Sequence, residues 1–340
     1  MRLKEIEYLR PILFVQLFCT HAFTIFTASS WKMPVGIERI ELYDWIARLS
    51  YSCMLELFTF ISGYVFFFVS QKKDLPFGKF VYSKFRRLMV PSIIFSILYY
   101  LFFIHDEESG LYLIYNILCG EGHLWYLPML FVCFLIAFFV RNVKRKHLLL
   151  IGALVISSFS RFPNVFRMSQ VSYYFFFFYL GIFVCRDRAF LIRYLIKNWN
   201  MVFISISVLF VLSLAILLPL NVELKLYNAD SWISGYFLSA GIRFINIVYS
   251  TVGVAFWYVI SIRLAQKIIR MPVWIPHFNV LSMGVYIFHQ FILMFLDYHT
   301  TFPAFCGSIV YPWFSIFISM PVSVLLSYAL RLTKIGKSLI

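Results

Sequence analysis

Long apolar runs recur along the whole chain, and they limit its fold more than any other feature. A membrane-spanning helix needs about 20 mostly apolar residues, and ten segments come close to that length. They lie near residues 11–30, 50–70, 88–104, 124–140, 147–160, 171–185, 200–220, 238–262, 278–298 and 307–330, of which the fourth, fifth and sixth are short. The sequence therefore predicts an all-α, polytopic membrane bundle of about ten transmembrane helices.

The composition excludes the other broad classes of protein. Of the 340 residues, 62% are hydrophobic and only 13% are charged, whereas soluble globular domains have roughly 45–50% apolar and about 25% charged residues. Aromatic residues make up 21% of the chain, which is too many for a disordered protein. Because the loops between the apolar runs are short, we expect a single domain over residues 1–340 and no separate soluble domain.

The charge is strongly positive and unevenly placed. There are 30 Lys and Arg residues against 15 Asp and Glu, a net charge of +15. The basic residues gather in alternate loops, near residues 72–87, 141–146, 186–197, 263–270 and 331–337. Cytoplasmic loops of membrane proteins carry this excess, so we expect both termini in the cytoplasm. Basic residues spread over many loops do not form a nucleic-acid-binding module, and the expected partner is the lipid bilayer.

Four ionisable residues interrupt the apolar runs: His21, Glu56, Arg243 and His289. Such residues are costly in a bilayer and usually functional. His21 follows Arg10 by close to three helical turns, so the two share a helix face about 16 Å apart. We expect His21 near the middle of its span and His289 at a similar depth. The alternatives are core histidines bonded to neighbouring helices and a structural Glu56–Arg243 pair.

Two further segments have both a functional and a structural interpretation. Lys84-Phe85-Arg86-Arg87, followed by Pro91, precedes the third apolar run. These cations either set the topology or bind an anion, such as the phosphates of a nucleotide-bearing donor. His123-Leu124-Trp125-Tyr126 lies at the start of the fourth run. Its aromatic rings fit an interfacial belt or, alternatively, a flat platform for sugar rings.

Several common sites have no counterpart in the sequence. It contains no GxSxG, P-loop, HExxH or GxGxxG motif. The histidines lack metal-ligand spacing, and no two of the six cysteines form a CxxC pair. We therefore expect no metal site and no disulfide.

Taken in chain order, six segments resemble motifs of the acyltransferase-3 family of integral-membrane O-acyltransferases. The spacing from Arg10 to His21 is similar to that family's Arg/Lys-x10-His signature. The other five segments are Leu57–Tyr64, Lys84–Arg87 before Pro91, His123–Leu127, Tyr173–Gly181 and Ser282–His289. They resemble, in turn, the family's Phe-Phe-x-x-Ser-Gly, Arg-x-x-Arg, His-x-Trp-Phe-Leu, Phe-x-x-Gly and Ser-x-x-x-Tyr-x-x-His elements. The resemblance covers almost the whole chain.

The chain departs from the family pattern at two places. Lys84 stands where arginine is commoner, with Arg86 as an additional cation. Lysine lacks the planar fork of arginine, so donor contacts are expected to shift to Arg86 or Arg87. Glu56 stands where many relatives have proline, which weakens the transfer of acceptor details from the family.

The resemblance implies an O-acyltransferase of the plasma (inner) membrane. It implies transfer of an acyl group, most often acetyl from cytoplasmic acetyl-CoA, to a hydroxyl of an extracytoplasmic glycan. No cofactor is expected to be permanently bound, since the acyl-CoA is a substrate. His21 is the expected general base or, alternatively, a transient acyl carrier, and Glu56 orients it or contacts the sugar. The expected donor-binding residues are Arg10, Lys84, Arg86 and Arg87, and the expected acceptor-binding residues are Ser62, His123, Trp125, Tyr126 and His289.

Other functions remain open from the sequence. A polysaccharide or lipid-linked sugar transporter would use the intramembrane charges as a translocation path. A structural partner of a glycan-synthesis complex, or an acyltransferase for a small molecule or peptidoglycan, is a further alternative. The sequence does not identify the acceptor, the acyl group or the oligomeric state.

Overall fold

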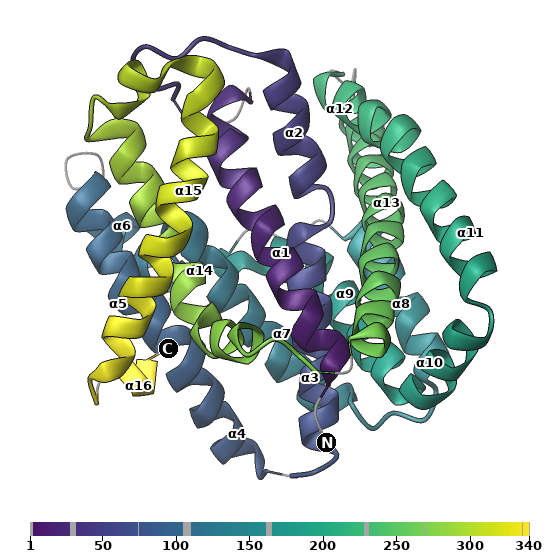
Figure 1. Cartoon of the computed structure of the whole chain (residues 1–340). Coiled ribbons are helices and arrows are strands. Elements are labelled where there is room, and N and C mark those ends of the chain that lie inside the picture. Colours follow the sequence, from purple (N-terminus) through teal and green to yellow (C-terminus); the bar gives the residue numbers. More distant parts are fainter. Residues whose placement is uncertain are drawn as a thin grey trace. The chain divides into compact units, whose positions relative to one another are not determined.

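The computed structural model describes residues 3–27, 32–73, 75–104, 110–160, 165–227, 231–268, 270–334 and 336–339, and every regular element in these ranges is helical (Figure 1). The chain divides into two compact units that alternate along the sequence. Unit 1 comprises Met1–Leu9, Ser52–Tyr82 and Met129–Ile269, and unit 2 comprises Arg10–Tyr51, Ser83–Pro128 and Arg270–Ile340. Each unit is therefore assembled from three separate stretches of chain.

Within the described residues, nine helices are long and apolar enough to span a membrane. They are Lys4–Phe26, Glu41–Ser70, Phe77–Ile104, Gly122–Val140, Val165–Arg186, Trp199–Leu226, Ile233–Lys267, Trp274–Tyr298 and Phe302–Leu332. Nine of the ten predicted spans are confirmed, and the chain is a multi-pass membrane protein. The fifth, near 147–160, corresponds to a shorter helix of 14 residues, Lys146–Phe159. The end of the first predicted span, residues 28–30, lies outside the described residues.

Most elements belong to one unit. Unit 1 holds α3 (Met54–Ser70), most of α7 (Tyr126–Val140), α8 (Lys146–Phe159), α9 (Met168–Arg186), α10 (Arg188–Lys197), α11 (Trp199–Leu212), α12 (Leu218–Leu226) and α13 (Trp232–Lys267). Unit 2 holds most of α1 (Lys4–Phe23), α2 (Glu41–Tyr51), α5 (Val90–Tyr99), α6 (Gly110–Cys119), α14 (Trp274–Tyr298), α15 (Phe302–Leu332) and α16 (Gly336–Leu339). Helix α4 (Phe77–Lys84) contributes residues to both.

Glycine allows close helix packing in unit 1, between α3 and α9. A Cβ atom at Gly63 would lie 1.9 Å from the carbonyl oxygen of Phe178, and one at Gly181 would lie 2.1 Å from that of Phe60. Neither helix can accept a side chain at these two points. Small residues have this role in membranes, where close packing and not the hydrophobic effect holds helices together.

A buried ion pair joins the start of α1 to α10 in unit 1. Arg188 donates to both carboxylate oxygens of Glu5, with its Nε atom 2.6 Å from Oε1 and its Nη2 atom 3.0 Å from Oε2. The hydroxyl of Tyr64 donates to Oε1 at 2.9 Å. Hydrogen bonding to Glu5 raises the pKa of Arg188 above its ordinary value. This network explains why helix α1 begins at Lys4, well before the apolar run.

We expect Arg188→Met to destabilise the protein by about 3 kcal/mol, because Glu5 would remain buried without its cation. The measurement is thermal unfolding of purified protein in detergent. A Glu5→Gln/Arg188→Met double variant should recover part of the loss, since no charge is then stranded. Asp187→Asn, which breaks the more exposed Lys146–Asp187 pair, should cost at most about 1 kcal/mol. Equal losses in the two single variants would contradict this expectation.

The basic segment lies inside a continuous helix, Phe77–Ile104, which begins before the predicted apolar run at residue 88. A π-helical turn at Phe85–Met89 joins α4 to α5 directly. The amide of Val90 bonds to the carbonyl of Phe85, and Pro91 follows. Because proline lacks an N–H group and clashes with the carbonyl four residues earlier, the wider turn lets the helix continue. A second π-turn, Ser213–Leu217, precedes Pro219 in the same way.

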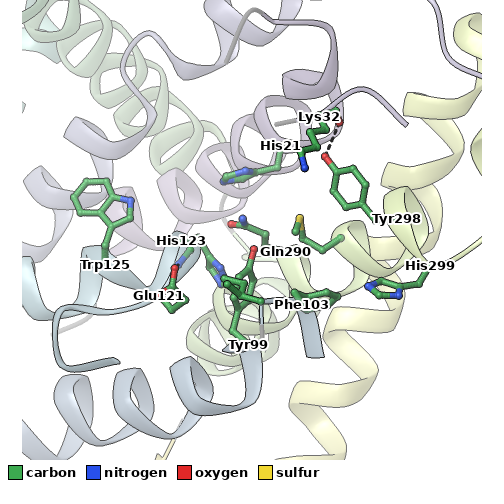
Figure 2. Close-up of a pocket in the computed structure, with 13 residues that line it drawn as sticks. His21, Lys32, Tyr99, Phe103, Glu121, His123, Trp125, Gln290, Tyr298 and His299 are labelled. Carbon is green, nitrogen blue, oxygen red and sulfur yellow. Dashed lines mark hydrogen bonds between the residues drawn. The ribbon is translucent and has the colours of Figure 1, made fainter. Parts of the chain in front are cut away.

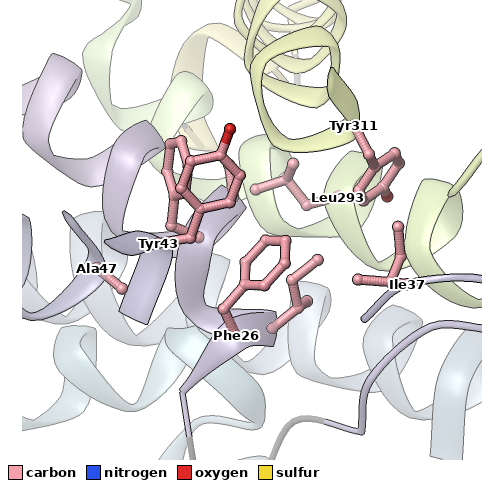
Figure 3. Close-up of a cluster of buried hydrophobic side chains, with 9 residues drawn as sticks. Phe26, Ile37, Tyr43, Ala47, Leu293 and Tyr311 are labelled. Atoms are coloured by element: carbon pink, nitrogen blue, oxygen red, sulfur yellow. The ribbon is translucent and has the colours of Figure 1, made fainter. Parts of the chain in front are cut away.

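A cluster of apolar side chains fixes the far end of α1 in unit 2 (Figure 3). Phe23 and Phe26 are fully buried in it. They pack against Tyr43 of α2, with ring centroids 4.9 and 5.1 Å away. Leu293 of α14 and Tyr311 of α15 complete the cluster. The residues directly after His21 are therefore held by three other helices.

Candidate functional site

A cavity of about 600 Å³ opens in unit 2 (Figure 2). Its lining is polar and aromatic in a protein that is otherwise apolar. The lining side chains include His21, Lys32, Tyr99, Phe103, Glu121, His123, Trp125, Gln290, Met294, Tyr298 and His299. Most come from α1, from α14 and from the segments on either side of α6, whereas Lys32 precedes α2 and His299 directly follows α14. A volume of this size suits a small-molecule or sugar-sized ligand.

His21 lies in the last turn of α1, two residues before the helix ends at Phe23. The sequence placed it near the middle of a span that begins at residue 11, and that placement is wrong. The helix starts seven residues earlier, at Lys4, because Glu5 is satisfied by Arg188. His21 therefore occupies a helix end that is exposed to the cavity.

His123 lies in a constrained turn before α7. Gly120 and Gly122 both have positive φ angles, +82° and +51°. A Cβ atom at Gly120 would approach the backbone of Leu124 and Trp125 at 2.6 Å, so the chain can fold back here only with glycine. The carboxylate of Glu121 accepts a hydrogen bond from the amide of Gly122, and the amide of Glu121 donates to Ser96 of α5. The glycine backbone angles and the hydrogen bonds of Glu121 therefore restrain the turn at Gly120, Glu121 and Gly122.

Two backbone carbonyls of α14 fix the tautomers of His123 and His289. The Nε2 atom of His123 lies 2.9 Å from the carbonyl oxygen of Ile287. The Nδ1 atom of His289 lies 2.6 Å from that of Tyr286. Since a carbonyl oxygen only accepts hydrogen bonds, each of these nitrogens carries the proton. The other nitrogen of each ring is left as an acceptor.

The three histidines form a continuous series of ring contacts. The ring centroid of His289 lies 4.9 Å from that of His21 and 5.1 Å from that of His123. His289 is fully buried and His123 is 6% exposed. The contact between His21 and His289 agrees with the similar depths predicted for them. Three imidazoles in contact form a concentration of proton-accepting groups beside one cavity.

Of the two other predicted acceptor residues of unit 2, one lines the cavity and the other is buried. Trp125 lines the cavity. Tyr126 is buried behind it, 6.0 Å from the ring of Tyr286. Tyr286 in turn donates its hydroxyl proton to the backbone carbonyl of His123 at 2.5 Å. Tyr126 therefore supports the histidine turn through Tyr286.

The predicted donor residues of unit 2 lie along the same helices as the cavity residues. Arg10 precedes His21 on α1, and Arg87 precedes Tyr99 on the helix that continues into α5. At 1.5 Å per residue these separations are roughly 16 and 18 Å. Arg86 and Arg87 are exposed, whereas Lys84 is half-buried. On each helix the basic residue thus lies roughly two to four turns from the nearest cavity residue.

Sequence reasoning missed several residues of this region. Tyr99, Gln290 and Tyr298 line the cavity, yet their residue types are too common in the chain to stand out. The short helix α16 contacts the π-turn at Phe85–Met89, so Lys337 joins the basic end of unit 2. The only available signal for Lys337 was its position in a basic loop.

Glu56 and Ser62 belong to unit 1. Glu56 is 7% exposed and accepts a hydrogen bond from the hydroxyl of Tyr173 at 3.1 Å. Arg243, its alternative structural partner, donates to the carbonyl oxygen of Ser160 and the hydroxyl of Ser169. Ser62 donates to the carbonyl oxygen of Phe58 within its own helix. The side chains of Glu56 and Ser62 therefore each form a hydrogen bond within unit 1.

Comparison with known proteins identifies the family. A family model described as an acyltransferase domain, of the acyltransferase-3 type, matches residues 3–332. The chain belongs to the acyltransferase-3 family. No curated protein and no solved structure matched it. The match covers all nine candidate spans and both units, so this acyltransferase is a membrane enzyme whose candidate site lies among its helices.

Proposed function

We propose that this acyltransferase transfers an acyl group from cytoplasmic acyl-CoA to a hydroxyl of an extracytoplasmic glycan. One observation carries the proposal: His21 and His123 line a polar and aromatic cavity and both contact His289, while Arg10 and Arg87 lie roughly 16 and 18 Å from cavity residues on the same helices. The two substrates would then approach opposite ends of unit 2. Membership of the acyltransferase-3 family supports the reaction class.

His21 is proposed as the general base. It takes the proton of the acceptor hydroxyl, whose oxygen then bonds to the acyl carbon as the carbon–sulfur bond of the thioester breaks. The leaving thiolate recovers the proton. In the alternative route, His21 first carries the acyl group as an acyl-imidazole. The cavity-facing position of His21 supports either role.

The donor phosphates are proposed to bind Arg10, Lys84, Arg86 and Arg87. Arg86 and Arg87 are exposed on the π-turn, where guanidinium groups can reach a phosphate directly. The pantetheine arm would follow α1 and α5 toward His21. Lys337 of α16 adds a further cation to this end.

The acceptor is proposed to bind in the cavity. Trp125 offers an aromatic face, and His123, Gln290 and the tyrosines offer polar groups for hydroxyls. His289 supports the cavity from behind. Glu56, which departs from the family pattern, and Ser62 belong to unit 1, and their roles toward His21 or the acceptor stay predictions. The inner membrane is the expected location, since acyl-CoA is cytoplasmic.

We expect an Arg86→Ala/Arg87→Ala variant to raise the KM for acyl-CoA about tenfold or more, because two charge-assisted contacts to phosphate are lost. Initial rates in membranes at varied acyl-CoA concentration give the measurement. Lys79→Ala removes an exposed cation from α4 and is the matched control. An unchanged KM together with an inverted topology would show that these arginines only orient the chain.

The direct test compares surface glycan from cells with the wild-type enzyme, with His21→Ala and with no enzyme. Mass spectrometry of the glycan should find a base-labile acetyl or succinyl ester only with the wild type. That result would establish O-acylation and identify the acyl group. A change in the amount of exported glycan without any ester would favour the transporter and contradict the proposal.

A further inference from the structure

One nitrogen of His123 is unexplained by the proposed chemistry. Its Nε2 atom is committed to the carbonyl of Ile287. Its Nδ1 atom is buried and has no hydrogen-bond partner among the described residues. Buried acceptors are rarely left unsatisfied, and His123 lines the cavity. Nδ1 is thus an unsatisfied acceptor on a side chain that lines the cavity.

Hydrogen bonds and two glycines with positive φ angles restrain the backbone around His123. The carbonyl oxygen of His123 accepts a hydrogen bond from the hydroxyl of Tyr286. The Nε2 atom of its ring donates to the carbonyl oxygen of Ile287, the next residue on α14. Two positive-φ glycines and the Glu121 cap hold the turn from the other side. Such restraint fixes both the direction and the tautomer of the imidazole. A ring prepared in this way can accept one hydrogen bond at a defined place.

We propose that His123 selects an acceptor with two neighbouring hydroxyls, and that its Nδ1 atom accepts a hydrogen bond from the hydroxyl next to the one acylated. This rests on the proposed function, in which His21 takes the proton of the reacting hydroxyl. A hydroxyl has only one proton to donate, so the two histidines serve two different hydroxyls. No proton leaves the second hydroxyl, and the transfer step itself is unchanged.

The arrangement of the three rings fits a diol. His21 and His123 both line the cavity and both contact the ring of His289. His289 is not among the lining residues and fills the space behind them. The two cavity histidines therefore pack against one shared ring. In the proposed complex, a sugar ring with one hydroxyl at His21 places the neighbouring hydroxyl at His123.

Two substitutions distinguish the roles of the two ring nitrogens of His123. His123→Gln places an amide nitrogen near the Nε2 position and keeps the donor to Ile287, but it removes the acceptor at Nδ1. His123→Asn places an oxygen near Nδ1 and loses the bond to Ile287. His277→Gln is the control, because His277 is exposed on α14 and bonds only within its own helix among the described residues. All variants are first compared for abundance and thermal unfolding.

The assay uses membranes containing the full enzyme, labelled acetyl-CoA or succinyl-CoA, and glycan extracted from cells without the enzyme. trans-1,2-Cyclohexanediol and cyclohexanol are added separately as inhibitors that differ by one hydroxyl. For the wild type we expect the diol to inhibit about tenfold more strongly, as one hydrogen bond of about 1.4 kcal/mol allows. For His123→Gln we expect the KM for glycan to rise about tenfold and the advantage of the diol to vanish. His123→Asn should retain part of that advantage.

The outcomes separate this inference from the function on which it rests. Absence of ester with the wild-type enzyme would contradict the proposed function itself. Ester formation with an unchanged glycan KM in His123→Gln, or equal inhibition of the wild type by the two alcohols, would overturn the role of His123 alone. A raised KM shared by His277→Gln would also overturn it, because the effect would then follow from any histidine change in unit 2.

Discussion

The variant His21→Ala is expected to form no detectable glycan ester while reaching wild-type abundance in the membrane. Removal of a general base typically lowers a rate by about 10²- to 10⁴-fold, and removal of an obligatory acyl carrier should lower it further. The side chain ends in the cavity, and the apolar cluster that holds the end of α1 is built from Ala22, Phe23 and later residues. The fold should therefore tolerate the change.

The comparison that checks this expectation uses glycan mass spectrometry together with immunoblots of membrane fractions. His277→Ala provides the matched control, since it removes an exposed imidazole from the same unit. Turnover close to wild type in His21→Ala would show that His21 is not the base. Loss of the protein from the membrane would instead point to a structural role, and His21→Gln, which keeps a polar side chain, would then be compared for abundance and turnover.

The same variant can distinguish the two roles of His21. Wild-type enzyme incubated with acyl-CoA but without glycan is digested and its peptides are weighed. One acyl group on the His21 peptide would establish the covalent route. Its absence, combined with a lost rate in His21→Ala, would favour the general base.

The spans could be predicted because the length of an apolar run can be read directly from consecutive residues of the sequence. Nine of the ten predicted segments match helices that are long enough to cross a bilayer. The remaining segment contains enough apolar residues for a helix, but the helix covers only Lys146–Phe159. Helix starts were harder to place, since α1 includes polar residues whose partner, Arg188, is distant in the sequence. Composition also does not show that the units alternate along the chain.

Parts of the candidate site could also be predicted, because ionisable side chains are rare in apolar segments. His21 and His289 stand out in apolar surroundings, and their rings are in contact. The bonds that fix the tautomers of His123 and His289 could not be foreseen, because they end on backbone carbonyls of α14. Every residue has such a carbonyl, so no sequence signal marks the ones that are used.

The glycines of the family motifs have a different explanation. Gly63 follows Ser62 in one family-like segment, and Gly181 ends another. The structure places each of them against the backbone of the other helix, where α3 and α9 pack together. Motif residues can thus maintain the packing of unit 1 without contacting a substrate.

This packing leads to a second large stability effect, of the same size as that expected for Arg188→Met. Gly63→Ala and Gly181→Ala should each destabilise the protein by about 3 kcal/mol, the upper end of the usual range for overpacking. The new methyl group would meet a backbone carbonyl at 1.9 or 2.1 Å. A backbone atom cannot turn aside as a side chain does, so α3 and α9 must separate along their length. Size-exclusion profiles and thermal unfolding in detergent would measure the loss.

Gly152→Ala in α8 supplies the control for this prediction. It lies in the same unit, also inside a helix, and a Cβ atom there would meet nothing within 4 Å. Alanine is the better helix former by about 1 kcal/mol, so this variant should be as stable as the wild type or slightly more so. If Gly63→Ala and Gly152→Ala unfold at the same temperature, the contact between α3 and α9 is looser than the structure indicates. If only the first two variants lose stability, close contact at these glycines is what holds α3 against α9.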